Sequence, residues 1–345
     1  MGHVKLEYSR NAVKRASKLV GRGDGSPDEI AAAKAILSNF RSAHAYPLNA
    51  VAMTARKRAL SVNQNAVFAQ RMKRLPTVMD KLERHPNMSI TTMQDLGGCR
   101  VIFPDISEVF QLANILGDLP KARVKVVKKY DYLLHQESDP HSGPKASGYR
   151  GIHLVYDYQA SKQEYRGLKI ELQIRTQLQH AWATAVETMD LFSGTRLKYS
   201  SGDDDIKKFF ALVSSLMAMH ENLDVVPGMP TDREMLVREI KEIDDRMGIT
   251  RRLSGYAAIV GSHANTDRRN ALTLELVRST QKLSVKVHET QAAAEARLRE
   301  LEAQENDDLD AVLVNIAKVG QLQAAYPNYY ADTDTFRRFV SEAIN

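Results

Sequence analysis

The stretch PKASGYRGIH, residues 144–153, combines residue types that suit a nucleotide-binding segment. Lys145 carries a charge that could contact a phosphate, and the ring of Tyr149 offers a face on which a base could stack. Alternation along a strand would place Tyr149, Gly151 and His153 on one face, where the glycine leaves the space between the two rings open. These types and their spacing predict a nucleotide-binding segment. A solvated loop of the same composition is the alternative.

A second candidate is the strand-like segment LKIELQIR, residues 168–175. Its alternation places Glu171, Gln173 and Arg175 on one face and four aliphatic side chains on the other. A carboxylate, an amide and a guanidinium in one row are groups that a metal–phosphate site requires. The alternative is a half-buried strand whose polar face meets solvent, which is the commonest meaning of this pattern.

Asp95, in the segment MQDLGGCRVIF, supplies a second carboxylate beside two glycines. Mg²⁺ that is bound together with phosphates usually needs only one or two carboxylates from the protein, so Asp95 and Glu171 predict a magnesium site. Strict alternation would place Arg100 on the face opposite Asp95, unless Gly97 and Gly98 form a β-bulge.

Basic residues precede this carboxylate in the segment RMKRLPTVMDKL, which contains Arg71, Lys73 and Lys81. Pro76 is typical of the first turn of a helix, and helix N-termini favour anions, so the cations before it are expected to gather at a phosphate site. A solvated basic face is the alternative. Another basic run, KARVKVVKKY, contains Lys129. It lies on a predicted strand that leads toward the segment PKASGYRGIH.

The hydrophobic pattern predicts an α/β arrangement for the first two thirds of the chain. The N-terminal third, including residues 48–75, has helical spacing, and Ser26 followed by Pro27 is typical of a helix N-terminus. Four short β-branched runs then predict a mixed sheet, and two helices follow it. The predicted strands cover residues 97–103, 123–130, 151–158 and 168–175, and the predicted helices cover residues 176–192 and 204–223.

A segment rich in proline and glycine, residues 224–232, predicts a boundary between two domains, 1–230 and 231–345. Beyond it, the pattern predicts a small α+β domain. Its elements are a charged helix over residues 233–247, a hairpin of strands 271–277 and 282–289, a helix over 290–304, a strand over 310–317 and closing helical segments around residues 324–336.

The composition excludes several classes of protein. A chain of 345 residues with 43% hydrophobic and 26% charged residues is typical of a globular protein and not of a disordered one. No apolar run approaches the ~20 residues of a membrane span, and the first residues lack the pattern of a secretory signal. The single cysteine, Cys99, excludes an intrachain disulfide and a zinc site of several thiolates. We therefore expect a cytoplasmic protein that does not associate with a membrane and contains neither a disulfide nor a zinc site.

Charge is distributed unevenly along the chain. Residues 231–345 contain 16 basic and 19 acidic residues, which leaves 32 basic and 23 acidic residues, a net charge of +9, for the remaining 230. A basic body with a mildly acidic tail suggests an anionic partner for the body and a tail that can compete for that surface. Two ordinary solvated surfaces are the alternative.

Four segments together resemble, in this order, the synthetase domain of the RelA/SpoT family: RMKRLPTVMDKL, DLGGCRVIF, PKASGYRGIH and ELQIRTQLQH. The resemblance covers roughly residues 65–190. Enzymes of that family transfer pyrophosphate from ATP to the ribose hydroxyl of a nucleotide. The resemblance implies an α/β synthetase domain with a mixed sheet flanked by helices, in which catalysis is mostly positioning and charge neutralisation.

The resemblance also implies how ATP is bound. It assigns the ATP phosphates to Arg71, Lys73 and Lys81. The family's Lys-Asp-Tyr appears here within KYDY, with Tyr130 in the place of the lysine, so Lys129 would have to replace that contact from one position earlier.

The remaining roles that the resemblance implies concern the metal and the acceptor. Asp95 and Glu171 would bind Mg²⁺, and Glu171 would also activate the attacking hydroxyl. Tyr149 would stack on the base of the acceptor. The catalytic set is then Glu171, Asp95, Tyr149 and His153, and the other acceptor-binding residues are Lys145, Gln173 and Arg175.

Further segments, from HAYPLN to LQAAYPNYYADTDTF, resemble the CapRel branch of this family over nearly the whole chain. Proteins of that branch are toxic small alarmone synthetases fused to their own antitoxin. The resemblance implies that residues 231–345 form a regulatory antitoxin domain, similar to a zinc finger without its ligands. It also implies that Tyr326 and Tyr329 block the active site until a phage structural (capsid) protein triggers release. Packing of these tyrosines in the small domain's own core is the alternative.

The function that the resemblance implies is pyrophosphate transfer from ATP, with Mg²⁺, to the 3′-terminal adenosine of tRNA, which would block translation during phage infection. The basic body fits such a polyanionic acceptor. One alternative is a synthetase of free (p)ppGpp or (p)ppApp, and another is a catalytically inactive RNA-binding or sensor module. The presence of the complete set Asp95, Glu171, Lys81 and Tyr149 argues against the inactive module.

Overall fold

The chain forms two compact units. The computed structural model describes residues 4–73, 75–117, 124–159, 162–193, 201–254, 271–277, 282–302, 304, 309–315 and 329–344. The first unit comprises Met1–Asp131 and Gly151–Thr176, and the second comprises Tyr132–Arg150 and Gln177–Asn345. The segment PKASGYRGIH is therefore divided between the units: residues 144–150 belong to the second unit and residues 151–153 to the first.

Three helices begin the first unit: α1 (Arg10–Arg22), α2 (Pro27–Ala43) and α3 (Ala45–Val62). The predicted start of α2 is confirmed by a capping box. The hydroxyl of Ser26 accepts a hydrogen bond from the backbone N–H of Glu29, whose carboxylate accepts one from the backbone N–H of Ser26 at 2.8 Å. α1 packs against α2 and against α4 (Leu75–Arg84), which begins beside Pro76 as the sequence predicts. Two short 3₁₀ helices, η1 (Ile90–Thr92) and η2 (Gln163–Tyr165), also belong to this unit.

The first strand, β1 (Val67–Met72), lies where the sequence pattern predicted a helix. α3 ends directly before Asn63, which adopts an extended conformation and whose side chain accepts a hydrogen bond from the backbone N–H of Asn65 at 2.7 Å. Such an asparagine turn offers the backbone an alternative to the next helical turn, and the β-branched and aromatic residues that follow favour a strand. The prediction of a continuous helix over residues 48–75 is therefore wrong.

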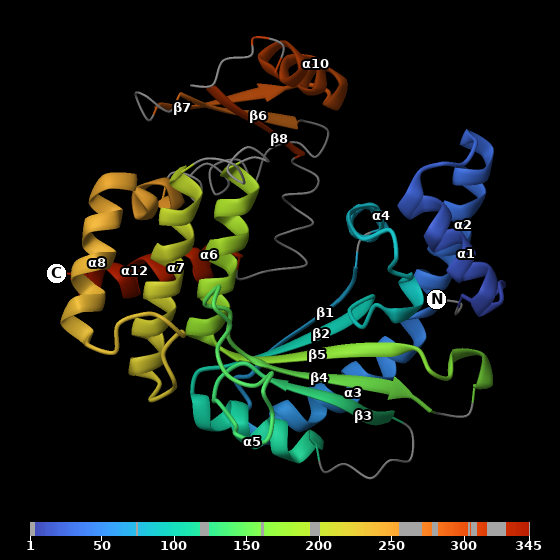
Figure 1. Cartoon of the computed structure of the whole chain (residues 1–345), viewed down its shortest axis with the longest axis horizontal. Coiled ribbons are helices and arrows are strands. Elements are labelled where there is room, and N and C mark those ends of the chain that lie inside the picture. The colour runs from blue at the N-terminus through green and yellow to red at the C-terminus, as the bar shows by residue number, and fades with distance from the viewer. Residues whose placement is uncertain are drawn as a thin grey trace. The chain divides into compact units, whose positions relative to one another are not determined.

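Five strands form a mixed sheet in the first unit (Figure 1). The strands are β1, β2 (Gly97–Phe103), β3 (Val124–Asp131), β4 (Ile152–Tyr158) and β5 (Lys169–Thr176). Their order across the sheet is β1-β2-β5-β4-β3, and every neighbouring pair is antiparallel except β2 and β5. The predicted mixed sheet and its four predicted strands are confirmed.

Helices cover one face of this sheet. The side chains of Ile170, Leu172 and Ile174 on β5 are fully buried, and α3 and α5 (Ile106–Gly117) pack against β2 and β5 (Figure 1). A Cβ atom on Gly97 would lie 2.9 Å from Ile170 and 3.4 Å from Leu48 of α3, so α3 lies on the face to which Ile170 points. The polar side chains that alternate with these residues along β5 therefore point to the opposite face.

In the second unit, helices α6 (Gln177–Ser193), α7 (Ser201–His220), α8 (Arg233–Met247) and α12 (Tyr329–Ile344) share one hydrophobic core. Trp182 of α6, Phe210 of α7 and Phe336 of α12 meet in this core. Because α6 and α7 share it with α8 and α12, this unit includes residues 177–230, which the predicted boundary at residue 230 assigned to the first domain. The regulatory role of residues 231–345 stays a prediction. None of the helices in the described part of the chain has both the length and the hydropathy of a membrane span.

A second sheet, of three antiparallel strands, also belongs to the second unit. Its strands are β6 (Ala271–Val277), β7 (Lys282–His288) and β8 (Leu309–Asn315), in the order β7-β6-β8, and α10 (Gln291–Glu302) packs against them. The predicted strands and helix are present, and the similarity of this region to a zinc finger stays a prediction.

Candidate active site

Two neighbouring rows of side chains cross the polar face of the five-stranded sheet. Strand register sets these rows, because residues that pair directly across two strands point to the same face. The first row contains Arg71, Gly98, Glu171, Val155 and Lys128. The second row contains Ala69, Arg100, Gln173, His153 and Tyr130. Three predicted site residues, Glu171, Gln173 and His153, therefore lie together on one face.

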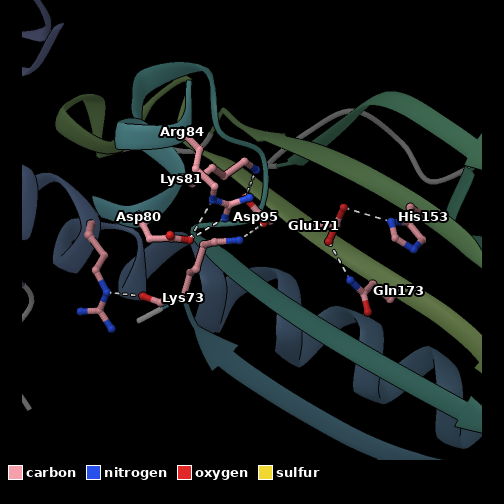
Figure 2. A network of polar contacts seen from close by, with 9 residues as sticks. Lys73, Asp80, Lys81, Arg84, Asp95, His153, Glu171 and Gln173 are labelled. Carbon is pink, nitrogen blue, oxygen red and sulfur yellow. Dashed lines mark hydrogen bonds and ion pairs between the residues drawn. The ribbon is translucent and has the colours of Figure 1, made fainter. Parts of the chain in front are cut away.

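Glu171 is mostly buried, and both of its carboxylate oxygens have partners (Figure 2). Nδ1 of His153 lies 3.0 Å from one oxygen, and the side-chain amide of Gln173 donates a hydrogen bond to the other at 2.8 Å. Burial alone would raise the pKa of Glu171. The hydrogen bonds from His153 and Gln173 and the charges of His153 and Arg175 outweigh it and lower the pKa to about 2. Glu171 is therefore ionised at neutral pH, as a cation-binding residue must be.

Gln173 connects this carboxylate to two arginines. Its side-chain oxygen accepts a hydrogen bond from Nη2 of Arg175 at 2.8 Å and lies 3.4 Å from Nε of Arg100. Guanidinium, amide and carboxylate thus form one continuous polar network, in which each bond polarises the next.

Arg100 is a site residue that the sequence pattern did not identify. β2 keeps an unbroken register over its whole length, so its glycines form no bulge. Asp95 precedes the strand, so alternation does not relate its direction to that of Arg100. The parallel pairing of β2 with β5, which places Arg100 opposite Gln173, is the observation that identifies it.

Asp95 lies in the turn before β2 and contacts two of the predicted phosphate-binding lysines (Figure 2). Nζ of Lys73 forms a close ion pair with one carboxylate oxygen, and Nζ of Lys81 lies 3.8 Å from the other, Oδ1. Within the described part of the chain, Oδ1 is buried and has no hydrogen-bond partner. One oxygen of Asp95 is therefore held by a lysine, whereas the other retains its capacity to bind a cation.

The main chain fixes the position of Lys73. Its backbone N–H donates a hydrogen bond to the carbonyl of Leu96 at 2.8 Å, and Nε of Arg41, on α2, donates to the carbonyl of Lys73. These two bonds and the pairing of β1 with β2 hold Lys73 beside Asp95, although the two residues are far apart in the sequence.

The other two predicted ATP contacts lie on the outer strands. Arg71 is exposed on β1, at one end of the first row. Lys129, on β3, forms an ion pair with Asp131 at 3.8 Å, and both point away from the face that carries the rows. Lys128, one position earlier, points to that face. The role of Lys129 stays a prediction, and the register favours Lys128 for it.

Lys145 and Tyr149 belong to the second unit, where Tyr132 completes their cluster. Nζ of Lys145 lies 4.2 Å from the centre of the Tyr132 ring and 5.5 Å from that of Tyr149, which are cation–π distances. The two rings lie 5.8 Å apart at 73°. The prediction that Tyr149 shares a strand face with His153 is wrong, because β4 begins only at Ile152 and the residue before it, Gly151, has a φ of +141° that interrupts the extended chain.

The two predicted autoinhibitory tyrosines cannot be placed beside these residues. Tyr326 lies outside the described residues. Tyr329 is the first residue of α12, and its side chain also lies outside the description. Their role stays a prediction.

Asp95 and Glu171 fit a magnesium ion by the chemistry of their side chains. Both are carboxylates, Glu171 is ionised, and one oxygen of Asp95 is buried without a hydrogen bond from the described residues. The described residues contain no cluster of three or more histidine, cysteine, aspartate or glutamate side chains that could bind a metal. Two carboxylates completed by phosphate oxygens and water are nevertheless a common arrangement for Mg²⁺.

The part of the chain that contains the two carboxylates and the two lysines matches a known protein family. Residues 70–191 match the model of a family described as "Region found in RelA / SpoT proteins". This part of the chain, about a third of it, is therefore similar to a region of RelA/SpoT proteins. Both carboxylates, both lysines at Asp95 and both rows of side chains, apart from Ala69 at one end, lie within it.

Individual relatives match shorter parts of the chain. GTP pyrophosphokinase YwaC from Bacillus subtilis (strain 168) is 31% identical over 123 residues, which are 33% of this chain and 52% of the relative. The chain thus spans about half the length of this curated relative. Among solved structures, small alarmone synthetase 2 from Bacillus subtilis is 21% identical, covers 53% of this chain and 94% of its own, and has a TM-score of 0.42. Small alarmone synthetase 1 from Bacillus subtilis, bound to its product pppGpp, is 23% identical, covers 45% and 73%, and has a TM-score of 0.34.

Proposed function

We propose that this chain is an ATP-dependent pyrophosphokinase. The observation that carries the proposal is a set of two carboxylates and two lysines in the part of the chain that matches RelA/SpoT proteins: Asp95, Glu171, Lys73 and Lys81 (Figure 2). Transfer of a pyrophosphoryl group requires little covalent chemistry from a protein beyond positioning and neutralisation of phosphate charge. Paired carboxylates and lysines supply that neutralisation.

In the proposed reaction, a hydroxyl oxygen of the acceptor attacks the β-phosphorus of ATP. A bond forms between these two atoms, the bond from the β-phosphorus to the oxygen shared with the α-phosphate breaks, and AMP leaves. Glu171 takes the hydroxyl proton, and Lys73 and Lys81 neutralise the phosphate oxygens. Mg²⁺ bound to Asp95 and Glu171 would supply additional charge neutralisation.

The acceptor is proposed to bind the cluster of Lys145, Tyr132 and Tyr149. An aromatic ring offers a stacking surface to any base, and a nearby ammonium group attracts phosphate, so this cluster has the chemistry of a nucleotide platform. Gln173, His153 and Arg175 are proposed to assist from the sheet.

The 3′-terminal adenosine of tRNA is our proposed acceptor. The net charge of +9 outside residues 231–345 supports it, because contacts between phosphates and basic side chains supply most of the non-specific affinity for RNA. GTP is the second candidate, because the curated relative that is 31% identical is named a GTP pyrophosphokinase.

A labelled-ATP assay tests the activity and separates the acceptors. The purified chain is incubated with ATP labelled at the γ-phosphate, Mg²⁺ and either deacylated tRNA or GTP, with Glu171→Gln as the inactive control. Label on tRNA supports the first acceptor, and label on a guanosine nucleotide supports the second. The same assay is run on the variant in which Tyr326 and Tyr329 are changed to alanine, because the tail is proposed below to hold the unmodified chain inactive. Label on neither acceptor, from both folded proteins, contradicts the pyrophosphokinase proposal.

We also propose that the enzyme is a toxin of anti-phage defence that its own tail holds inactive until a phage structural protein binds. The segment YPNYY supports this proposal, because two tyrosines three residues apart, Tyr326 and Tyr329, could occupy positions where bases stack. Changing both to alanine should make the expressed protein toxic without a trigger, and adding Glu171→Gln should remove the toxicity. Normal growth of cells that contain soluble double variant would contradict autoinhibition.

A further inference from the structure

Arg150 is a charged residue in an unusual environment. It is the last residue of the loop Tyr132–Arg150, and only 3% of it is exposed. Burial lowers its pKa to about 10, against the opposing effect of Glu221 and Asp224. One of its terminal nitrogens, Nη1, is buried without a hydrogen-bond partner among the described residues. Burying a guanidinium in this way costs free energy, which the hydrogen bonds that Arg150 does form must offset.

Arg150 joins the loop to helix α7 and to the segment that follows α7. Its Nε donates a hydrogen bond to the hydroxyl of Ser214 at 2.9 Å, and its Nη2 donates to the carbonyl of Asp224 at 2.6 Å. The same hydroxyl of Ser214 donates to the carbonyl of Gly148 at 2.6 Å. Arg150 and Gly148 therefore share one anchor, and Tyr149 lies between them in the sequence.

Asp224 anchors the other end of the same loop. Its carboxylate accepts a hydrogen bond from the backbone N–H of His135 at 2.8 Å, while its carbonyl accepts the bond from Arg150. One residue thus receives hydrogen bonds from both ends of the loop that carries Lys145 and Tyr149. Because the bonds to Asp224 involve its backbone and its side chain separately, they fix its position as well as that of the loop.

Gly148 shows how closely the loop approaches the helices. It has a φ of +90°, which favours glycine. A Cβ atom there would lie 2.9 Å from Trp182 on α6, 3.0 Å from Ser214 and 3.2 Å from Ala211 on α7. The loop backbone therefore lies directly on α6 and α7, with no room for a side chain between them.

We propose that Arg150 is a positioning residue for the acceptor, because it fixes the Lys145–Tyr132–Tyr149 cluster on the helices of the second unit. This inference rests on the proposed function, in which that cluster binds the acceptor. Arg150 makes no contact with the acceptor itself. Arg150 is bonded to the hydroxyl of Ser214, and the same hydroxyl bonds the carbonyl of Gly148, so the backbone is held on both sides of Tyr149. The ring is then already in place when a base arrives, and less ordering is required on binding.

The proposal predicts that Arg150 variants affect the two substrates differently. Arg150→Met keeps the length of the side chain but removes its donors, and we expect the KM for deacylated tRNA or GTP to rise at least about tenfold. The KM for ATP should change by less than about twofold, because the lysines at Asp95 belong to the other unit. Arg150→Lys retains one cationic donor and should recover part of the loss. Arg246→Met is the matched control, since Arg246 is an exposed arginine of the second unit paired with Asp205 at 2.8 Å, and it should leave both KM values unchanged.

Two kinetic results would overturn the proposal. One is an equal change in both KM values, and the other is a lysine variant that is folded and no better than the methionine variant. If Arg150→Met does not fold, Ser214→Ala replaces it, because this change removes the bond from Arg150 and the bond to Gly148 together. Its acceptor KM should rise, and a folded variant with an unchanged acceptor KM would also overturn the proposal.

Hydrogen exchange separates failure of this inference from failure of the proposed function. In Ser214→Ala, the amides of residues 143–150 should exchange faster than in the unmodified chain, whereas those of β5 should not change. This measurement needs no activity, so it applies even if the unmodified chain transfers no label to either acceptor. Unchanged exchange in residues 143–150 would show that these contacts do not hold the loop.

Discussion

The two compact units bring candidate functional side chains together in different ways. In the first, strand register places Glu171, Gln173 and His153 in neighbouring rows, so the hydrogen bonds of the sheet fix their arrangement. In the second, Lys145 and Tyr149 lie in a loop that is held by a few contacts with helices. A site on a sheet is expected to keep its geometry when one side chain changes, whereas a site on a loop depends on each anchor.

The two units also differ in the partners of a mostly buried glutamate, Glu171 in the first unit and Glu275 in the second. Glu275, on β6 of the second unit, is bound by Arg297 through two hydrogen bonds of 3.0 and 3.1 Å and lies 3.2 Å from Nζ of Lys286. Both oxygens of Glu275 thus face permanent cations, one of them in a bidentate arrangement. Glu171 is hydrogen-bonded instead by an imidazole and an amide, neither of which is a permanent cation, so a metal ion could take their place at the carboxylate. We expect Glu171 to serve the reaction and Glu275 to serve stability.

The largest effect is expected for Glu171→Gln. Loss of the negative charge removes a proposed metal ligand and the proton acceptor, so the kcat of label transfer should fall by about 10³-fold or more. The chain should stay folded with a lower thermal midpoint, because His153 and Gln173 lose the charge that they stabilise. Transfer within tenfold of the unmodified rate would contradict the assignment of Glu171.

A smaller effect, limited to the acceptor, is expected for Tyr149→Ala. Loss of a stacking ring costs ~1–3 kcal/mol per base, so acceptor affinity should fall roughly 5- to 150-fold while ATP binding is unchanged. Tyr149→Phe retains the ring and serves as the control. If ATP binding is lost and acceptor binding persists, the two pockets have been assigned the wrong way round.

The sequence was most informative where one strand carried the whole pattern. Alternation in LKIELQIR was sufficient to place Glu171, Gln173 and Arg175 on the polar face, because a strand has a period of two whatever its neighbours are. Arg100 could not be assigned in this way. Its place in the site depends on which strand lies beside β2, and that pairing is a long-range property of the fold.

The sequence was least informative where the chain leaves regular structure. β1 was mistaken for a helix because its residues suit both, and the asparagine turn before it decides between them. Tyr149 was wrongly placed on a strand because alternation assumes an extended backbone. Gly148 and Gly151 instead have positive φ values, which the sequence pattern does not reveal. The anchor at Ser214 is more than 60 residues from the loop that it holds, so no local pattern could reveal it.

Acid pH should destabilise the first unit before the second. His44, buried in the first unit, has a pKa lowered to about 4, mainly because burial disfavours its charged form. The unfolded chain therefore binds more protons than the folded one below pH 6.5, and stability is lost as pH falls from there toward 4. Between pH 7.5 and pH 5 the loss should be about 2 kcal/mol. Hydrogen exchange in the helices of the first unit should show this loss in the unmodified chain but not in His44→Gln, and the same slope in both would contradict it.

The smallest effect is expected for Glu275→Gln. The pKa of Glu275 is lowered, chiefly by the hydrogen bonds from Arg297, so the carboxylate stabilises the fold above its ordinary pKa of 4.5 and this contribution is lost as pH falls below it. At neutral pH the variant should exchange amide hydrogens faster in β6 and β7, because Arg297 and Lys286 lose their partner, while the kcat of label transfer should not change. As pH falls below 4.5, the difference in exchange between the variant and the unmodified chain should shrink, since the glutamate itself becomes neutral. A fall in kcat comparable to that of Glu171→Gln would show that the two carboxylates do not differ in the way that their partners indicate.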